Sequence, residues 1–304
     1  MSTMSFLTLQ NEIAAQTRLD NTESAKNTLI KRWINQAQQE IWSKYDWPWS
    51  LEREIVQTVV DKTAGTVSVT AGATTATGAS TAFASADVGK YIQFSGSNDW
   101  YRITAVASST SLTIESAYNA TSDLSAGTYT IRQFFYSVSS SVEKILSMRQ
   151  MQTPAKLELM SFRDFDEKKP NVDNTGKSLR YVLYGYDSSD NWRFSLYPSP
   201  DAAFNLEVRY KKKSTDLSAD ADVSEIPEKW HSTVLLDGSL YRGFAYVDGV
   251  QMGRHNTAYT RFKEGIREMI SDADPESDYH PVMQNRERRS GVSEIVRFPD
   301  DYGS

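Results

Sequence analysis

The sequence has no cysteine among its 304 residues. Disulfide bridges, thiolate metal sites and cysteine nucleophiles are therefore excluded, and we expect the chain to fold in a reducing cytoplasm. Long apolar runs are also missing, because no stretch approaches the roughly 18 apolar residues that a membrane-spanning helix needs. The opening residues carry neither a basic leader nor a continuous apolar segment, so we expect no secretory signal and no membrane partner.

Histidine is scarce, with only His231, His255 and His280 in the whole chain. No two of them have the spacing of a helical metal site, and no serine occupies a G-x-S-x-G elbow. His231 follows Trp230 at the start of a predicted helix, which favours a structural hydrogen bond over catalysis. The sequence thus predicts no metal site, no cofactor and no catalytic residue.

Carboxylates offer the one enzymatic alternative. Glu40, Glu52 and Glu54 include side chains that could form the acid pair of a glycosidase, as in a tail-associated phage cell-wall hydrolase. Their spacing does not separate them from ordinary surface glutamates. The denser acidic loop that begins at Asp216 lacks the order of a calcium-binding loop, so we expect it to be solvated.

Negative charge slightly exceeds positive charge, with 39 acidic against 33 basic residues and a net charge of -6. Such a balance opposes tight wrapping of nucleic acid, which depends on neutralised phosphates. It is compatible with DNA that passes nearby, because a like-charged channel repels phosphate and lets a duplex slide. The apolar fraction is only 39% and the mean hydropathy is -0.52, which favours an extended molecule of several lobes.

Helical periodicity is confined to the two ends of the sequence. One pair of helices is predicted over Phe6–Thr17 and Ser24–Tyr45, and a second pair over residues 227–248 and 250–272. Because neither pair can bury its apolar stripe alone, we expect the four helices to form one bundle. The predicted bundle core comprises Ile30, Trp33, Ile34, Ile41, Trp230, Val234, Tyr241, Phe262 and Ile266.

Strand-type patterns fill the sequence between the helical pairs. From Thr63 to Arg132 the composition changes to Ala, Ser, Thr and Gly, and glycine turns separate the short β runs TVSVT, KYIQF, YRITAV, SLTIE and TYTIR. We expect this segment to be a self-contained module inserted into a parent antiparallel β region. A short helix is predicted at 161–169, and a hairpin turn at 187–190.

The fold predicted from these patterns is α+β. It consists of a four-helix bundle formed by the N- and C-terminal helix pairs and interrupted by an antiparallel β region, which carries an inserted small β-barrel or sandwich. The predicted divisions are 1–50 and 225–273 for the bundle, 51–62 and 133–224 for the β domain, 63–132 for the inserted module, and 274–304 for an extended C-terminal arm.

The predicted arm combines a basic cluster with alternating apolar residues near its end. Such a segment is typical of chains that become ordered on the surface of a partner. The residues that we expect to make this contact are Arg286, Arg288, Arg289, Val292, Ile295, Val296 and Phe298.

Three parts of this layout resemble the head-to-tail adaptor, or connector, proteins of tailed bacteriophages. The first is the helix that runs into an aromatic break in RWINQAQQEIWSKYDWPW, followed by a strand. The second is the strand, polar loop and helix opening in SLYPSPDAAFNLEVRYKKKSTDLSADADVSEIPEKWHSTVLLDGSLYRGFAYVD. The third is the charged last helix that leads into the arm. The inserted module is not part of the pattern that we associate with this family.

This resemblance implies a structural virion protein that is assembled in the host cytoplasm and lies at the head–tail junction. It implies a closed ring of about twelve copies, in which each subunit contacts the next heterologously. The arm would dock on the portal protein, the β region would hold a tail or nozzle protein, and packaged DNA would pass through without specific binding. Two alternatives stay open, namely the hydrolase and a carbohydrate- or receptor-binding tail protein that uses the inserted module.

Overall fold

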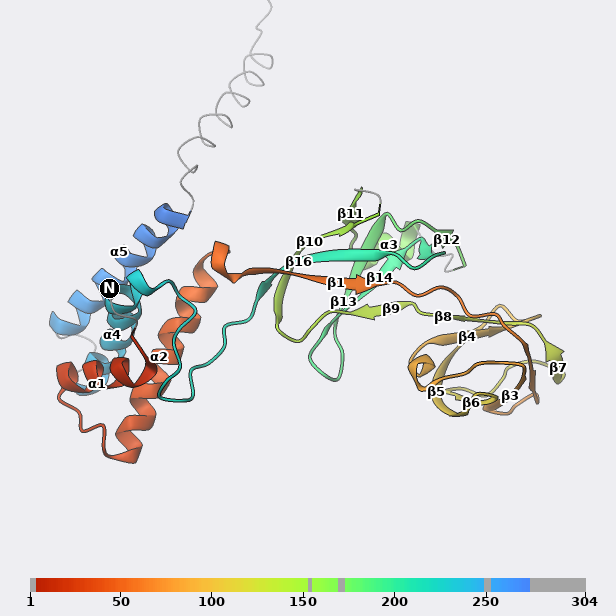
Figure 1. Ribbon diagram of the computed structural model, residues 1–304, viewed down its shortest axis with the longest axis horizontal. Coiled ribbons are helices and arrows are strands. Elements are labelled where there is room, and N and C mark those ends of the chain that lie inside the picture. The colour runs from red at the N-terminus through yellow and green to blue at the C-terminus, as the bar shows by residue number, and fades with distance from the viewer. Residues whose placement is uncertain (1–3, 153–154, 169–172, 249–252, 274–304) are drawn as a thin grey trace, which may run out of the picture. The chain divides into compact units, whose positions relative to one another are not determined.

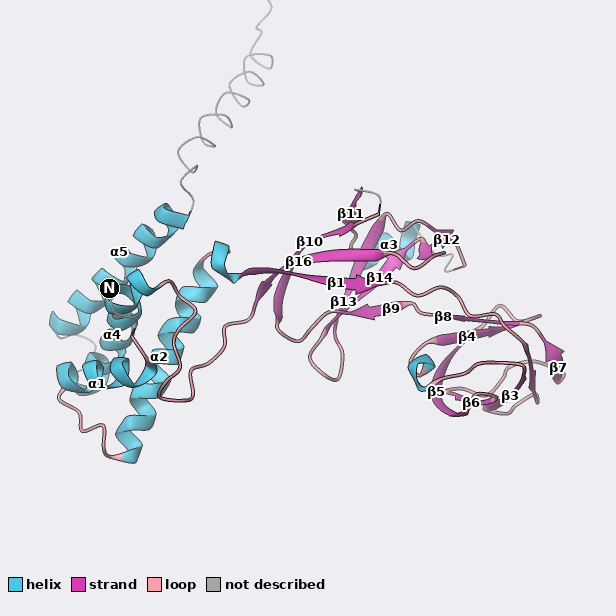
Figure 2. Ribbon diagram, viewed as in Figure 1, coloured by secondary structure: helices cyan, strands magenta, loops and turns pink. Residues whose placement is uncertain are grey.

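A computed structural model describes residues 4–152, 155–168, 173–248 and 253–273 of the chain (Figure 1). The chain divides into two compact units, one built from residues 1–51 and 214–304 and the other from residues 52–213. Sixteen strands and five α-helices are assigned in the described part (Figure 2). Four of the helices belong to the first unit, which we call the helical unit. Every strand residue except Leu51 belongs to the second, which we call the β unit.

The helical unit contains α1 (Phe6–Thr17), α2 (Ser24–Lys44), α4 (Leu236–Val247) and α5 (Gly253–Ala273). The hydroxyl of Ser5 accepts a hydrogen bond from the Thr8 amide and so caps the start of α1. After α2 the chain turns extended and enters a short 3-10 turn at Pro48, because proline cannot continue a helix.

The segment that precedes α4 is not α-helical. Glu228–Trp230 forms a 3-10 turn, and His231–Leu235 forms a single π-helical turn. A helix was expected to begin at Pro227, but the regular part begins only at Leu236. The wider π-turn still leads Val234 and Leu235 into the core, where both are buried.

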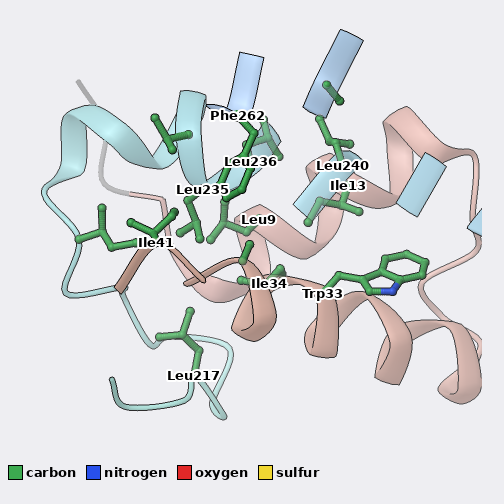
Figure 3. Packing of buried hydrophobic residues seen from close by; sticks show 14 of the residues in the cluster. Leu9, Ile13, Trp33, Ile34, Ile41, Leu217, Leu235, Leu236, Leu240 and Phe262 are labelled. Atoms are coloured by element: carbon green, nitrogen blue, oxygen red, sulfur yellow. The ribbon is translucent and has the colours of Figure 1, made fainter. Parts of the chain in front are cut away.

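One apolar core joins the helices of this unit (Figure 3). Leu9 and Ile13 of α1 face Ile34 of α2, and Leu240 and Phe262 approach from the two later helices. Leu217 and Ile226 enter the same core from the loop before the 3-10 turn. Each fully buried aliphatic side chain contributes about 1.5–3 kcal/mol of transfer free energy, so this shared core is the main stabilising feature of the unit.

The first sheet of the β unit has seven strands in the order β1-β16-β10-β11-β13-β14-β9. In this sheet β10 pairs antiparallel with β16 and β11, and β14 pairs antiparallel with β13 and β9. By contrast, β11 and β13 pair in parallel, because α3 (Phe162–Lys168) lies in the connection between them. A separate two-stranded pair joins β12 (Thr175–Gly176) to β15 (Ser199–Pro200). The strands of the seven-stranded sheet are β1 (Leu51–Gln57), β9 (Phe135–Ser137), β10 (Val142–Gln150), β11 (Ala155–Leu159), β13 (Arg180–Tyr186), β14 (Trp192–Tyr197) and β16 (Asn205–Lys212).

The second sheet also has seven strands, in the order β7-β2-β3-β6-β5-β4-β8. Its core is its own, because every buried residue of the cluster comes from the segment between Val67 and Ile131. At its base, Lys62 and Ile131 form an isolated bridge, and Arg132 donates to Asp61 at 2.6 Å. The strands are β2 (Thr66–Val69), β3 (Thr75–Ala79), β4 (Tyr91–Phe94), β5 (Trp100–Ser108), β6 (Ser111–Ile114), β7 (Leu124–Gly127) and β8 (Tyr129–Arg132).

The predicted fold class is therefore wrong. The protein is mostly β, with two curled seven-stranded sheets and only five α-helices in the described residues, and it is not a four-helix bundle that carries a small inserted barrel. Two physical reasons account for the difference. The helices α1 and α4 have only 12 residues each against 21 in α2 and α5, so they do not form four matched bundle helices. Many strands have only four residues, and runs that short carry a weak periodic signal.

Candidate functional site

The described residues do not reach the predicted portal-docking arm. All seven of its predicted contact residues lie beyond residue 273, and His280 lies there too. These are Arg286, Arg288, Arg289, Val292, Ile295, Val296 and Phe298, and their role stays a prediction.

The residues predicted for the bundle core are brought together in the helical unit. Seven of them are buried in one cluster, namely Ile30, Trp33, Ile34, Ile41, Val234, Phe262 and Ile266. The remaining two, Trp230 and Tyr241, are partly buried and pack against that cluster. They therefore lie at its margin, where Lys229 lies over the Trp230 ring and the Tyr241 hydroxyl meets Glu40.

Tyr241 and Arg242 hold the carboxylate of Glu40. The Tyr241 hydroxyl donates to Glu40 at 3.0 Å, and the Arg242 guanidinium donates to it at 2.6 Å. Burial raises the pKa of Tyr241 to about 12, which the nearby Arg242 charge only partly opposes, so the phenol remains a hydrogen-bond donor. Glu40 thus ties α2 to α4.

The other two glutamates considered as glycosidase acids also have structural partners. Glu52 of β1 accepts hydrogen bonds from Lys212 at 2.9 Å and from the Tyr210 hydroxyl at 3.4 Å. Glu54 accepts from the Ser139 amide at 3.1 Å. These contacts join β1 to β16 and to the loop before β10. Both carboxylates therefore have structural partners, and neither needs a catalytic role to explain its position.

The histidines that the structure describes are also held by structural contacts. His231 is buried, and its Nε2 lies 2.6 Å from the carbonyl oxygen of Ile226. His255 stacks on Tyr259 of α5, with a ring distance of 6.2 Å. Within the described ranges, no three His, Cys, Asp or Glu side chains gather as they would around a metal ion. Of the helices described, none combines the length and apolar character that crossing a bilayer requires.

The β unit holds an aromatic cavity that was not predicted from the sequence. Its volume is about 230 Å³. Trp100 of β5 packs edge-on against Phe134 at 4.9 Å, donates its indole N–H to Asp173 at 3.0 Å, and lies under the Arg132 guanidinium at 5.0 Å. The run Phe134-Phe135-Tyr136 was the one sequence signal for it. The full lining is Tyr91, Trp100, Phe134, Phe135, Phe165, Tyr184, Ser195, Leu196, Tyr197 and Ser199.

A comparison with known families gives a match over most of the chain. The sequence model described as the SU10 adaptor protein matches residues 4–289 of this chain. That range begins before α1, includes both seven-stranded sheets, and ends within the segment predicted to be an arm. Among curated proteins, none matches the sequence.

Proposed function

Because the chain belongs to the SU10 adaptor protein family, whose members are structural bacteriophage proteins, we propose that it forms the ring that joins the portal of the phage head to the tail. The match over residues 4–289 is the observation that carries this proposal, since it spans nearly the whole chain. The structural contacts of the glutamates and of the described histidines agree with a scaffold role.

A closed ring requires two different surfaces on each subunit, one for each neighbour. The edge strand β1 offers one of them, because it lies at the end of the first sheet and, among the strands that the structure describes, is hydrogen-bonded to β16 alone. Ile55 in this strand is 56% exposed, and Val60 just after it is 49% exposed. An unpaired strand edge with exposed apolar side chains beside it invites pairing with another chain, and in our proposal a second copy of this protein covers it.

In the proposed ring, the arm and the β unit contact different partners. The arm from residue 274 onward docks on the portal through its arginines and its apolar residues, because arginine pairs well with carboxylates and buried apolar anchors provide most of the binding energy. The β unit holds the next tail or nozzle component. Packaged DNA passes through the lumen without specific binding, in keeping with the net charge of -6.

The test uses purified portal rings. Tagged portal should retain the full-length chain on a column, and the retained complex should contain the chain in a fixed ratio close to one per portal subunit. A chain that flows through, or that binds in a variable ratio, would contradict the adaptor role. The same eluate examined by mass photometry gives the number of copies directly.

The aromatic cavity favours a second candidate, which is carbohydrate or receptor binding by a tail protein. Aromatic faces such as those of Trp100 and Tyr91 suit the apolar side of a sugar ring, and the cavity is lined mostly by such side chains. Immobilised chain would then retain cell-wall or lipopolysaccharide fragments, and Trp100→Ala would lose them. Equal retention by the two chains would rule out the cavity as the site.

A further inference from the structure

A second pocket of the β unit has charged walls. Its volume is about 330 Å³, and its lining comes from the turn before β4, from β5, and from the β9–β14 pair. Lys90, Arg102 and Arg193 supply three positive charges, and Asp187 is the one carboxylate in this lining. This pocket therefore gathers positive charge from separate elements, although the net charge of the chain is -6.

Arg193 is the central residue of this pocket. It lies on β14 opposite Ser137, and its guanidinium is 4.8 Å from the centre of the Phe135 ring. Its Nε is buried and has no hydrogen-bond partner, and none of the ion pairs among the described residues includes Arg193. An arginine cannot lose its proton in a protein, and a buried donor left unpaired is costly. The Nε itself is closed to solvent, so an acceptor in the pocket would meet the terminal guanidinium nitrogens, which form no hydrogen bond within the described residues.

Asp187 does not provide the missing acceptor. One of its oxygens accepts from the amides of Ser189 at 2.8 Å and Asn191 at 3.0 Å. The other accepts from the Asn191 side-chain amide at 3.0 Å and from the Ser137 hydroxyl at 3.2 Å. These hydrogen bonds, that of the Asn191 side chain first, lower the pKa of Asp187, so it stays ionised and committed to its own turn.

The two other cations keep donors available for a ligand. Lys90 gives one hydrogen bond to Asp87 at 2.9 Å, and an ammonium group has three protons. Asp87 is shared with Lys62, so this group of three charges is net positive. Arg102 lies 3.5 Å from Glu115 in an exposed pair, which is a weak form of ion pair.

We propose that this pocket binds an oxyanion of the phosphate class, with Arg193 as its main donor. A tetrahedral group suits donors that arrive from three different elements, and a guanidinium can bind two of its oxygens at once. The phosphate group could come from free phosphate or from the backbone of DNA, and the chemistry at Arg193 is the same for both.

Calorimetric titration of the full-length chain with sodium phosphate, at an ionic strength held constant with sodium chloride, tests the proposal. The unmodified chain should bind phosphate with one site per subunit. Arg193→Gln should weaken binding roughly tenfold or more, because it removes a charge-assisted hydrogen bond. Arg102→Gln should weaken phosphate binding several-fold. Because the Arg102 side chain is exposed, we expect this variant to fold, so it tests the pocket even if the change at Arg193 disturbs the sheet.

Arg163→Gln is the matched control, because Arg163 lies on α3 in the same unit, is 87% exposed, and does not line the pocket. It should bind phosphate as the unmodified chain does. Absence of phosphate binding, or equal binding by all four chains, would overturn the proposal. A short DNA duplex that displaces bound phosphate would identify the DNA backbone as a source, and a duplex that does not would leave free phosphate as the ligand.

Discussion

Gly238 shows at the scale of one residue how closely the helices of the first unit approach. A Cβ atom at this position of α4 would come within 2.6 Å of the Phe262 ring and 3.1 Å of Ala37. Glycine costs about 1 kcal/mol relative to alanine in a helix interior, so an open site would favour alanine. The close approach of Phe262 and Ala37 to the backbone at position 238 outweighs the preference of a helix for alanine.

We therefore expect Gly238→Ala to lower the free energy of unfolding by about 1–3 kcal/mol through overpacking. Gly253→Ala is the matched control, because a Cβ there meets no atom within 4 Å. It should leave stability unchanged or raise it slightly. Urea denaturation followed by far-ultraviolet circular dichroism measures both, and two variants of equal stability would show that the helices are not packed as described.

Asp87 is the most deeply buried carboxylate of the second sheet, at 1% exposure. Burial acts to raise the pKa of Asp87. Its carboxylate, however, accepts hydrogen bonds from Lys62 at 2.5 Å, from Lys90 at 2.9 Å and from the Ala84 amide. Together these bonds outweigh burial and hold the pKa below its usual value. The unfolded chain therefore binds this proton more readily than the folded chain. Its contribution to stability is fully present above the ordinary aspartate pKa and is lost as the pH falls through the lowered value.

Asp87→Asn should destabilise the β unit by about 3 kcal/mol at pH 7, because it leaves two ammonium groups without their shared partner. The same substitution should flatten the loss of stability that the unmodified chain shows below about pH 4. Asp99→Asn, at an exposed position in the loop between β4 and β5, is the control and should change neither. If the Asp87→Asn variant lost stability at acid pH as steeply as the unmodified chain, a group other than Asp87 would be responsible for that loss.

At the scale of elements, the edge strand β1 carries the proposed contact between copies. Ile55→Lys should keep the fold, because the side chain is 56% exposed, and should prevent ring formation, because a lysine on a strand edge blocks pairing. Leu159→Lys is the control, since Leu159 is 60% exposed on β11 away from that edge. Light scattering of each chain with portal rings measures assembly, and a complete ring from the Ile55 variant would exclude this edge.

The second sheet is predicted to fold as an independent module. Its core residues all come from its own segment, and the Lys62 amide donates to the Ile131 carbonyl at 2.9 Å, so the two ends lie together. A short glycine-serine turn in place of residues 63–132 should leave the helical unit and the first sheet folded. Residues 62–132 expressed alone should also fold. Loss of structure in both chains, seen by circular dichroism, would show that the module depends on its surroundings.

Local elements were predictable where one residue type decides them. The helix over Phe6–Thr17 and the break at Pro48 follow from apolar spacing and from proline, and both are confirmed. The π-turn at His231–Leu235 was not predictable, because its apolar spacing resembles that of an α-helix. The parallel pairing of β11 with β13 was also missed, since strand patterns do not encode direction. The aromatic cavity and the pocket around Arg193 require strands that only the folded sheet arrangement brings together.

At the scale of the whole molecule, the arm beyond residue 273 is predicted to make the joint with the portal. Truncation after Asp274 should leave the helical unit folded, because every residue of its core cluster lies at or before Ala273. It should abolish retention by portal rings. A full-length chain with Arg286, Arg288 and Arg289 changed to Gln separates charge from length and should bind weakly. Retention of the truncated chain at full strength would assign the joint to the folded units.

The central claim is that copies of this chain form one closed ring on the portal. Electron microscopy of the purified chain mixed with its portal, with rotational symmetry determined from end-on views, tests it most directly. We predict an added ring of about twelve copies, coaxial with the portal and open at its centre. A portal that carries no added density, or a chain attached at scattered points on its surface, would contradict the claim.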